Sequence, residues 1–245
     1  MMQGPSKRHH IVSAYDRDLD HLLALVAEMG DHAVEQTQRA VQALLEGDAT
    51  VAHQVIDREP EVDTLNLAAD EEVFSIIARR QPAAVDLRLV LAVSKVVGEL
   101  ERAGDKAARI ARSTLRLLES PVQILAEPLP RLLRENDAIA CCMLDRAVEA
   151  MAGADLAKAV GVLDDDDRLH AASLALSQAL LAANGPARGE PLAAMLTIAH
   201  ALDRIGNHAA NIAEQAIYVI RGEDVRYRNR ALLIDALRAE QGAQT

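Results

Sequence analysis

The stretch LERAGDKAARIA, at residues 100–111, decides the fold because it occurs twice. Residues 202–213 read LDRIGNHAANIA, and seven of the twelve positions are identical. Upstream of each copy lies a second matching pair, QRAVQALLEGD at 38–48 and DRAVEAMAGAD at 145–155. Chance likeness between amphipathic helices is the competing explanation, but the shared arginine and glycine do not follow from alanine richness. The chain therefore contains a duplicated unit of about 100 residues.

Each unit is expected to consist of three helices. Apolar residues recur at alternating three- and four-residue steps, the period of a helix that buries one face. Pro60 falls inside the second helix and predicts a kink there. The predicted fold class is all-α, with two tandem three-helix bundles and six long helices. The expected organisation is a first bundle at 11–118, a proline-rich linker at 119–130, a second bundle at 131–220 and a tail at 221–245 that can form a short helix.

Composition limits the class of function. The 245 residues include no Trp, one Phe and three Tyr, so the core must be built from Leu, Val, Ile and Ala. A formal net charge of −11 argues against a nucleic-acid partner, which requires clustered Lys and Arg. The sequence contains no signal peptide and no apolar run long enough for membrane insertion. The adjacent Cys141 and Cys142 cannot join distant segments, and a cytoplasmic protein is expected.

Acidic residues are placed as a metal site requires. Glu101 and Asp105 lie one turn apart, nearly opposite the apolar face of their helix. When the second and third helices form a hairpin about Pro82, a second pair, Glu59 and Asp63, comes level with the first.

The second unit repeats this arrangement. A hairpin about the break at Pro186 sets Asp166 and His170 beside Asp203 and Asn207. Because two hairpins align equivalent pairs independently, the four positions in each unit are predicted to form a cation site. His170 and Asn207 stand where the first unit has carboxylates, which predicts weaker binding or fewer ions in the second unit.

Neighbouring carboxylates repel one another by roughly 3 kcal/mol per pair at about 5 Å and an effective dielectric near 20. Protons, the nearby Arg102 and Lys106, or a bound cation must offset this repulsion. Oxygen-rich sites suit Mg, Ca, Mn or iron, and a histidine shifts the preference toward iron or zinc. The alternative is a solvated charged face, the usual meaning of exposed acidic residues. His208 is expected to be an exposed helical histidine, and no pattern points to an enzyme.

The duplicated motifs resemble the PhoU family of phosphate-signalling regulators. Further likenesses are Tyr15–Leu19, Gln81-Pro82 with Asp86-Leu87-Arg88, and Ala216-Ile217-Tyr218 followed by Gly222-Glu223. The resemblance covers the chain from about Ile11 to Tyr227. It implies two three-helix bundles whose surface E(D)xxxD motifs hold multinuclear iron or zinc clusters, with carry-over to Glu59, Asp63, Glu101, Asp105, Asp166 and Asp203.

The resemblance also implies partners. Family members are cytoplasmic, often homodimeric, and negatively regulate the phosphate-starvation response by coupling the phosphate ABC transporter to a sensor histidine kinase. The implied partners are the ATPase subunit of that transporter and the sensory domain of the kinase. Two other classes stay open: a non-metal helical scaffold or chaperone-like protein, and a ferritin-like metal protein. The ferritin-like class requires carboxylates inside a four-helix core, whereas the helical wheel places these residues outside.

Overall fold

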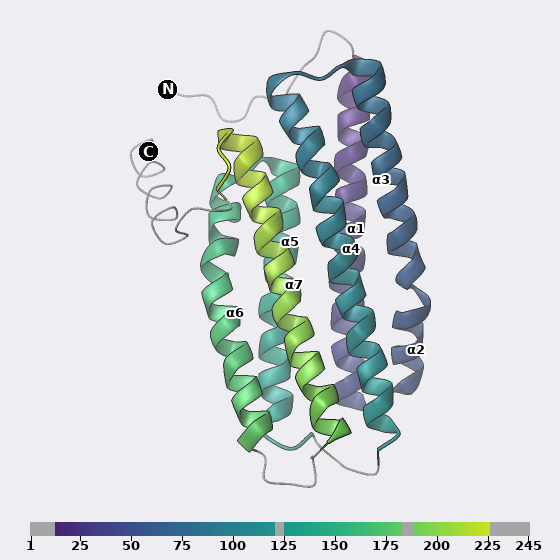
Figure 1. Ribbon diagram of the computed structural model, residues 1–245, viewed down its shortest axis with the longest axis vertical. Helices are drawn as coiled ribbons and strands as arrows, with labels where there is room; N and C mark the ends of the chain where they lie inside the picture. Colours follow the sequence, from purple (N-terminus) through teal and green to yellow (C-terminus); the bar gives the residue numbers. More distant parts are fainter. Residues whose placement is uncertain (1–12, 121–124, 183–188, 226–245) are drawn as a thin grey trace.

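The computed structural model describes residues 13–120, 125–182 and 189–225, and every regular element within them is an α-helix. In chain order the helices are α1 (Ser13–Glu46), α2 (Ala49–Asp57), α3 (Glu59–Arg80), α4 (Ala84–Leu118), α5 (Leu129–Gly153), α6 (Leu156–Ala182) and α7 (Glu190–Arg221). The predicted all-α fold is confirmed: α1, the pair α2–α3 and α4 form the first unit, and α5, α6 and α7 form the second (Figure 1).

The helix predicted to be kinked at Pro60 is instead interrupted at Arg58. Pro60 is the second residue of α3, where its missing N–H costs no helical hydrogen bond. Arg58 bridges the interruption, because its Nη1 lies 2.8 Å from Glu35 Oε1 on α1 and its Nε lies 3.1 Å from Glu61 Oε2. The proline therefore begins a helix rather than bending one.

The turn between α1 and α2 follows from two residues. Gly47 has a φ of +70°, a left-handed conformation that glycine adopts without steric penalty. The Oδ1 atom of Asp48 accepts hydrogen bonds from the backbone N–H groups of Thr50 and Val51, at 2.8 and 3.1 Å. Asp48 thus caps α2.

The two units share one core. Buried apolar residues of both units form a single continuous cluster, and α4 makes its most extensive contact with α7 of the other unit. A second contact between the units joins α1 to α5. In Figure 1 the long helices run side by side along the length of the molecule, with α4 and α7 at its centre. The duplicated units therefore pack as one bundle.

Two equivalent glycines set how closely the outer helices approach the central ones. Gly104 of α4 lies against Val62 of α3, with 3.4 Å between an ideal Cβ at the glycine and the nearest Val62 methyl. Gly206 of α7 lies against Leu169 of α6, where the same construction leaves only 1.9 Å. Both contacts agree with the hairpin registers expected from the sequence, in which Glu59 and Asp63 lie level with Glu101 and Asp105.

Two of the segments predicted from the sequence, the linker and the tail, include residues that the structure does not describe. The predicted linker at 119–130 includes residues 121–124, and the predicted tail at 221–245 includes residues 226–245, all outside the described residues. Among the helices that are described, none combines the length and the apolar character needed to cross a membrane.

Candidate metal centre

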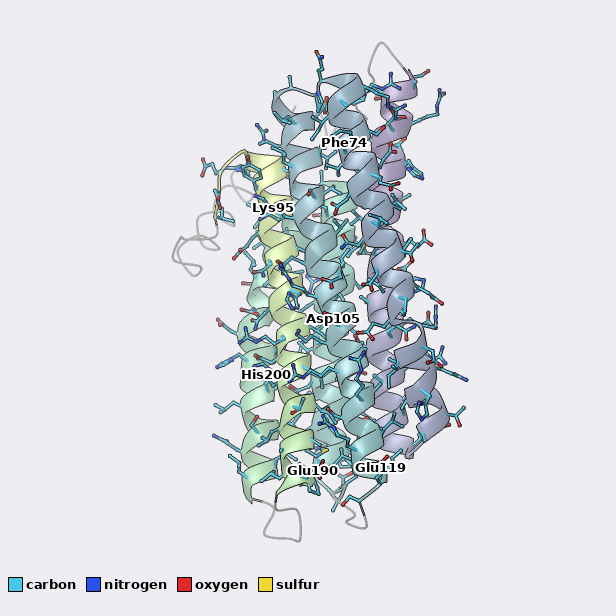
Figure 2. All side chains as sticks on the ribbon, turned by 45° about the vertical axis from the view of Figure 1, so that its right-hand side comes forward. Phe74, Lys95, Asp105, Glu119, Glu190 and His200 are labelled. Carbon is cyan, nitrogen blue, oxygen red and sulfur yellow. The ribbon has the colours of Figure 1, made fainter. Side chains whose placement is uncertain are left out.

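The first acidic pair lies on the outer face of α4, as predicted. Glu101 and Asp105 are partly exposed on this helix, and Asp63 is exposed on the neighbouring α3. Figure 2 shows Asp105 near the middle of the bundle, on a face open to solvent. The carboxylates therefore stand outside the shared core and accessible from solution.

The electrostatics of Glu101 show that these carboxylates are close enough to interact. Partial burial raises the pKa of Glu101, and the charges of Asp105 and Asp63 raise it further. Arg102 and Lys106 act in the opposite direction and do not reverse the shift. Negative charge at this point of the surface is thus only partly compensated by the protein itself.

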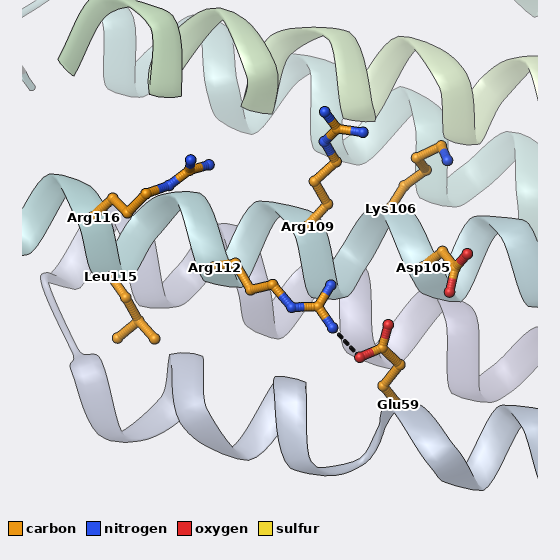
Figure 3. Close-up of a pocket in the computed structure, with 7 residues that line it drawn as sticks. All are labelled: Glu59, Asp105, Lys106, Arg109, Arg112, Leu115 and Arg116. Carbon is orange, nitrogen blue, oxygen red and sulfur yellow. Dashed lines mark hydrogen bonds and ion pairs between the residues drawn. The ribbon is translucent and has the colours of Figure 1, made fainter. Parts of the chain in front are cut away.

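Glu59, the fourth predicted member, is held by a cation instead. Its carboxylate forms an ion pair with Arg112 of α4, shown as the dashed line in Figure 3. Glu59 still lines the same hollow as Asp105, so the two side chains are near one another. The pairing of Arg112 with Glu59 was not predicted, because Arg102 and Lys106 were the only cations expected to offset the acidic charge.

Within the described parts of the chain, no three His, Cys, Asp or Glu side chains are arranged to hold one metal ion. The first unit nonetheless offers carboxylate oxygens from two adjacent helices, the donor type that hard divalent cations prefer. Asp63 is exposed, so its side chain is free to rotate, and Glu59 can join once it leaves Arg112. The donor chemistry of this unit fits a metal ion.

The second unit brings together two of its four predicted residues. His170 Nδ1 lies 3.8 Å from Asp203 Oδ1, and both line a hollow of about 190 Å³ between α6 and α7. Asp166 and Asn207 are partly exposed and are not among the residues that line this hollow. The His170 side chain is 80% exposed, whereas that of Asp203 is 25% exposed. The second unit therefore offers fewer carboxylate oxygens than the first, because His170 and Asn207 stand where the first unit has acids.

The exposure predicted for His208 from the sequence was wrong. His208 is not an exposed histidine, because its side chain is only 13% exposed and its Nδ1 lies 2.8 Å from Glu99 Oε2. Asn211 Nδ2 donates to the same oxygen at 2.9 Å, and Arg102 Nη1 donates to the other at 2.9 Å. Burial of Glu99 opposes its ionisation, but the bonds from His208 and Asn211 prevail and lower its pKa. An ionised Glu99 accepts hydrogen bonds only, so the Nδ1 atom of His208 is the donor in this contact.

A signal for this contact was present in the sequence. On a helical wheel His208 lies about 40° from Ile212 and about 60° from Ile205, at the edge of the apolar face. Its partner Glu99 lies on a helix of the other unit, and no pattern within one unit indicates which face of α4 meets α7. The pairing joins the two units through α4 and α7.

A row of basic residues lies beside the first acidic pair. Figure 3 shows the hollow of about 640 Å³ that Glu59 and Asp105 share with five residues of α4. These are Lys106, Arg109, Arg112, Leu115 and Arg116. Acidic and basic side chains therefore lie next to one another in this hollow.

Comparisons with known proteins agree with this architecture. The family model described as PhoU domain matches the chain twice, at residues 26–114 and 134–216. The chain is 37% identical over 225 residues to a phosphate-specific transport system accessory protein PhoU homolog from Burkholderia sp, covering 89% of this chain and 93% of that protein. It is 34% identical over 233 residues to the homolog of the same name from Pseudomonas aeruginosa, covering 93% of each.

The fold is similar to solved structures as well. The crystal structure of PhoU from Pseudomonas aeruginosa superposes with a TM-score of 0.79 at 31% identity, covering 85% of this chain and 100% of that one.

Proposed function

The chain belongs to the PhoU family, and on that premise we propose that it is a cytoplasmic regulator of phosphate homeostasis that turns over no substrate. The observation that carries the proposal is a family match extending through both units, with relatives named as accessory proteins of the phosphate-specific transport system. The partly compensated acidic surface of the first unit supports a metal-dependent form of this role.

The regulatory step is negative. In this proposal the protein, as a homodimer, contacts the ATPase subunit of a phosphate ABC transporter and the sensor histidine kinase of the phosphate response. It represses the starvation response while phosphate is imported. A rigid helical bundle suits this task, because it presents fixed outer faces to two partners without closing around either.

The metal site of the proposal has two unequal halves. In the first unit Glu101, Asp105 and Asp63 would hold the ion, and Glu59 would join after release from Arg112. In the second unit Asp203 and His170 would bind more weakly, with Asp166 and Asn207 as further oxygen donors. Iron or zinc is the proposed metal, with Mn, Mg or Ca as other ions that suit carboxylates. A bound cation would neutralise the surface that partners meet.

Metal analysis tests the site. We expect the protein, purified without chelator, to carry metal, and the double variant Glu101→Ala with Asp105→Ala to lose most of the metal of the first unit. A matched control, Asp70→Ala with Glu71→Ala, removes two exposed carboxylates of α3 and should keep the wild-type metal content. Equal metal content in both double variants would defeat the assignment.

Arg112 provides an independent check on the same site. Replacing it by Gln frees the Glu59 carboxylate, so the variant should bind metal several-fold more tightly than wild type. Unchanged affinity would show that Glu59 takes no part.

A reporter strain tests the regulation. Deletion of the gene should raise expression from a phosphate-starvation promoter in phosphate-rich medium, and the wild-type chain should restore repression. Repression that survives the deletion would overturn the regulatory role.

A non-metal helical scaffold is the second candidate, and the ion pair between Glu59 and Arg112 favours it. Such a scaffold would repress the reporter normally when the double variant Glu101→Ala with Asp105→Ala replaces the wild type. A metal-dependent regulator would not. A ferritin-like protein is disfavoured, because the acidic pairs of α4 lie outside the shared core.

A further inference from the structure

The basic row on α4 is a charged feature from which the proposed function uses only Arg112, the partner of Glu59. Lys106, Arg109, Arg112 and Arg116 follow one another at three- and four-residue steps, so they form a continuous stripe along one side of the helix. All four line the hollow of about 640 Å³, and Leu115 is its only apolar member. This feature, named here the basic groove, stands out on a chain of net charge −11.

Most of the cationic charge of the basic groove is not used internally. Arg112 pairs with Glu59, and Arg116 donates to Ser113 Oγ of its own helix at 3.0 Å. Lys106 and Arg109 form no hydrogen bond or ion pair with any other described residue. Figure 3 shows Lys106, Arg109 and Arg116 extending along the same side of α4, while Arg112 turns toward Glu59. Three cations therefore face the hollow together without a carboxylate partner.

The length of the basic groove indicates the shape of its ligand. Lys106 and Arg116 are ten residues apart, which corresponds to about 15 Å along a helix. A single small anion can contact only neighbouring members of the row. An anion whose charges are spread along a chain can contact all of them.

The chemistry of the basic groove favours phosphate over carboxylate. Guanidinium groups bind phosphate oxygens in pairs, and three of the four cations are arginines. Glu59 and Asp105 line the same hollow and repel an anion, so a bound anion must lie nearer to the cations than to these carboxylates. A phosphate group carries up to two charges at neutral pH, where a carboxylate carries one.

We propose that the basic groove binds phosphate oxyanions, and that a chain of condensed phosphates spanning Lys106 to Arg116 binds more tightly than orthophosphate. None of the cations of this site is a metal ligand in the proposed function, although Glu59 and Asp105, which are, line the same hollow. Its position next to the acidic pair places phosphate recognition on the same outer face as cation binding.

Calorimetric titration of the full-length protein tests this proposal. The protein is first stripped of metal with a chelating resin, so that a failure of metal binding cannot be mistaken for a failure here. The probes are orthophosphate, tripolyphosphate, sulfate and a poly-glutamate peptide, each at low and at moderate salt. Tripolyphosphate should bind at least about tenfold more tightly than orthophosphate, and its affinity should fall as salt rises.

The test variant is Lys106→Gln with Arg109→Gln, because neither side chain leaves a carboxylate unpaired when it is removed. Its affinity for tripolyphosphate should fall at least about tenfold. The control variant, Arg131→Gln with Arg134→Gln, removes two exposed cations from α5 and should bind as wild type does. A melting curve shows that both variants are folded.

Each outcome decides the matter. Equal affinity for orthophosphate and tripolyphosphate would overturn the proposed preference for a phosphate chain, even if the test variant lost both. No binding of either phosphate, or the same loss in the control, would overturn the proposal. Binding of poly-glutamate in preference to the phosphates would also overturn it, in favour of docking by an acidic protein segment.

Discussion

Glu99 links the two central helices, α4 and α7, through side-chain hydrogen bonds. Its side chain is only 15% exposed, and it accepts hydrogen bonds from His208 and Asn211 of α7 as well as Arg102 of α4. Replacing it by Ala leaves the largely buried Nδ1 donor of His208 without its partner, whereas the exposed Asn211 can bond to water. We expect the free energy of unfolding to fall by about 2 kcal/mol, measured by urea denaturation.

The control for this prediction is Glu28→Ala, which removes an exposed glutamate of α1 and should change stability by less than about 0.5 kcal/mol. Equal effects of the two substitutions would contradict the role assigned to Glu99.

Asp137 gives the molecule a pH dependence of predictable sign. Burial raises its pKa above the ordinary 3.8, and the hydrogen bond from the Cys141 thiol only partly opposes that rise. The folded protein thus binds this proton more tightly than the unfolded chain, so ionisation of Asp137 destabilises the fold. The loss begins as pH rises past 3.8 and is complete above the folded pKa.

Asp137→Asn removes this penalty and keeps an acceptor oxygen for Cys141. We expect the variant to be more stable than wild type by on the order of 1 kcal/mol at pH 7, and equally stable near pH 3. Thermal melts across this range check the difference. A stability gain that does not change with pH would contradict the explanation by ionisation.

At the scale of residues, the sequence predicted where the acidic side chains lie but not which residues they pair with. The positions of Glu101 and Asp105 follow from one helical wheel, since the face opposite the apolar stripe is solvated. The pairing of Glu59 with Arg112 does not follow, because it depends on side-chain rotation in a hollow between α3 and α4. The pairing of His208 with Glu99 requires the mutual orientation of the two units, which the periodicity of each unit leaves undetermined.

At the scale of helices, the two glycines of the repeated motif are not equivalent in the space available to them. A methyl group at Gly206 would lie 1.9 Å from Leu169 Cδ2, whereas at Gly104 it would lie 3.4 Å from Val62. Leu169 is only 1% exposed, so it cannot move aside without disturbing the core. Gly206→Ala should therefore cost about 1–3 kcal/mol of stability.

Gly104→Ala is the matched comparison. Its methyl group makes an ordinary contact, and Ala is the better helix former by up to about 1 kcal/mol. We expect this variant to be as stable as wild type or more stable, as measured by chemical denaturation. The reverse order of the two variants would show that α6 and α7 are packed less closely than described.

The hairpin registers were predictable because they depend on turns near identifiable breaks in the sequence. The contacts of Val62 with Gly104 and of Leu169 with Gly206 lie close to the expected levels. The interruption at Arg58 was predicted only as a kink, since Pro60 is compatible with either a bent helix or the start of a new one. The ion pairs of Arg58 with Glu35 and Glu61 favour the second arrangement.

At the scale of the whole molecule, duplication in sequence does not give two independent bodies. One apolar cluster runs through both units, and α4–α7 and α1–α5 contacts join them. Gly30 of α1 packs so closely on Val148 of α5 that an added Cβ would lie 2.7 Å from a valine methyl. The sequence predicted two bundles in tandem and could not show this fusion, because either unit alone accounts for its own periodicity.

The shared core predicts a single unfolding transition. Scanning calorimetry of the full chain should give one peak, with a ratio of calorimetric to van't Hoff enthalpy of about 1. Two separated transitions would contradict a common core and would indicate that the units unfold as independent domains.

Crystals soaked in Mn²⁺ and measured for anomalous scattering would test most directly whether the acidic face of α3 and α4 binds cations. We predict a strong anomalous peak bounded by Glu101, Asp105 and Asp63, a weaker one or none beside Asp203, and the Glu59 carboxylate turned away from Arg112. Peaks confined to other acidic residues, or no peak on this face at saturating Mn²⁺, would contradict the account.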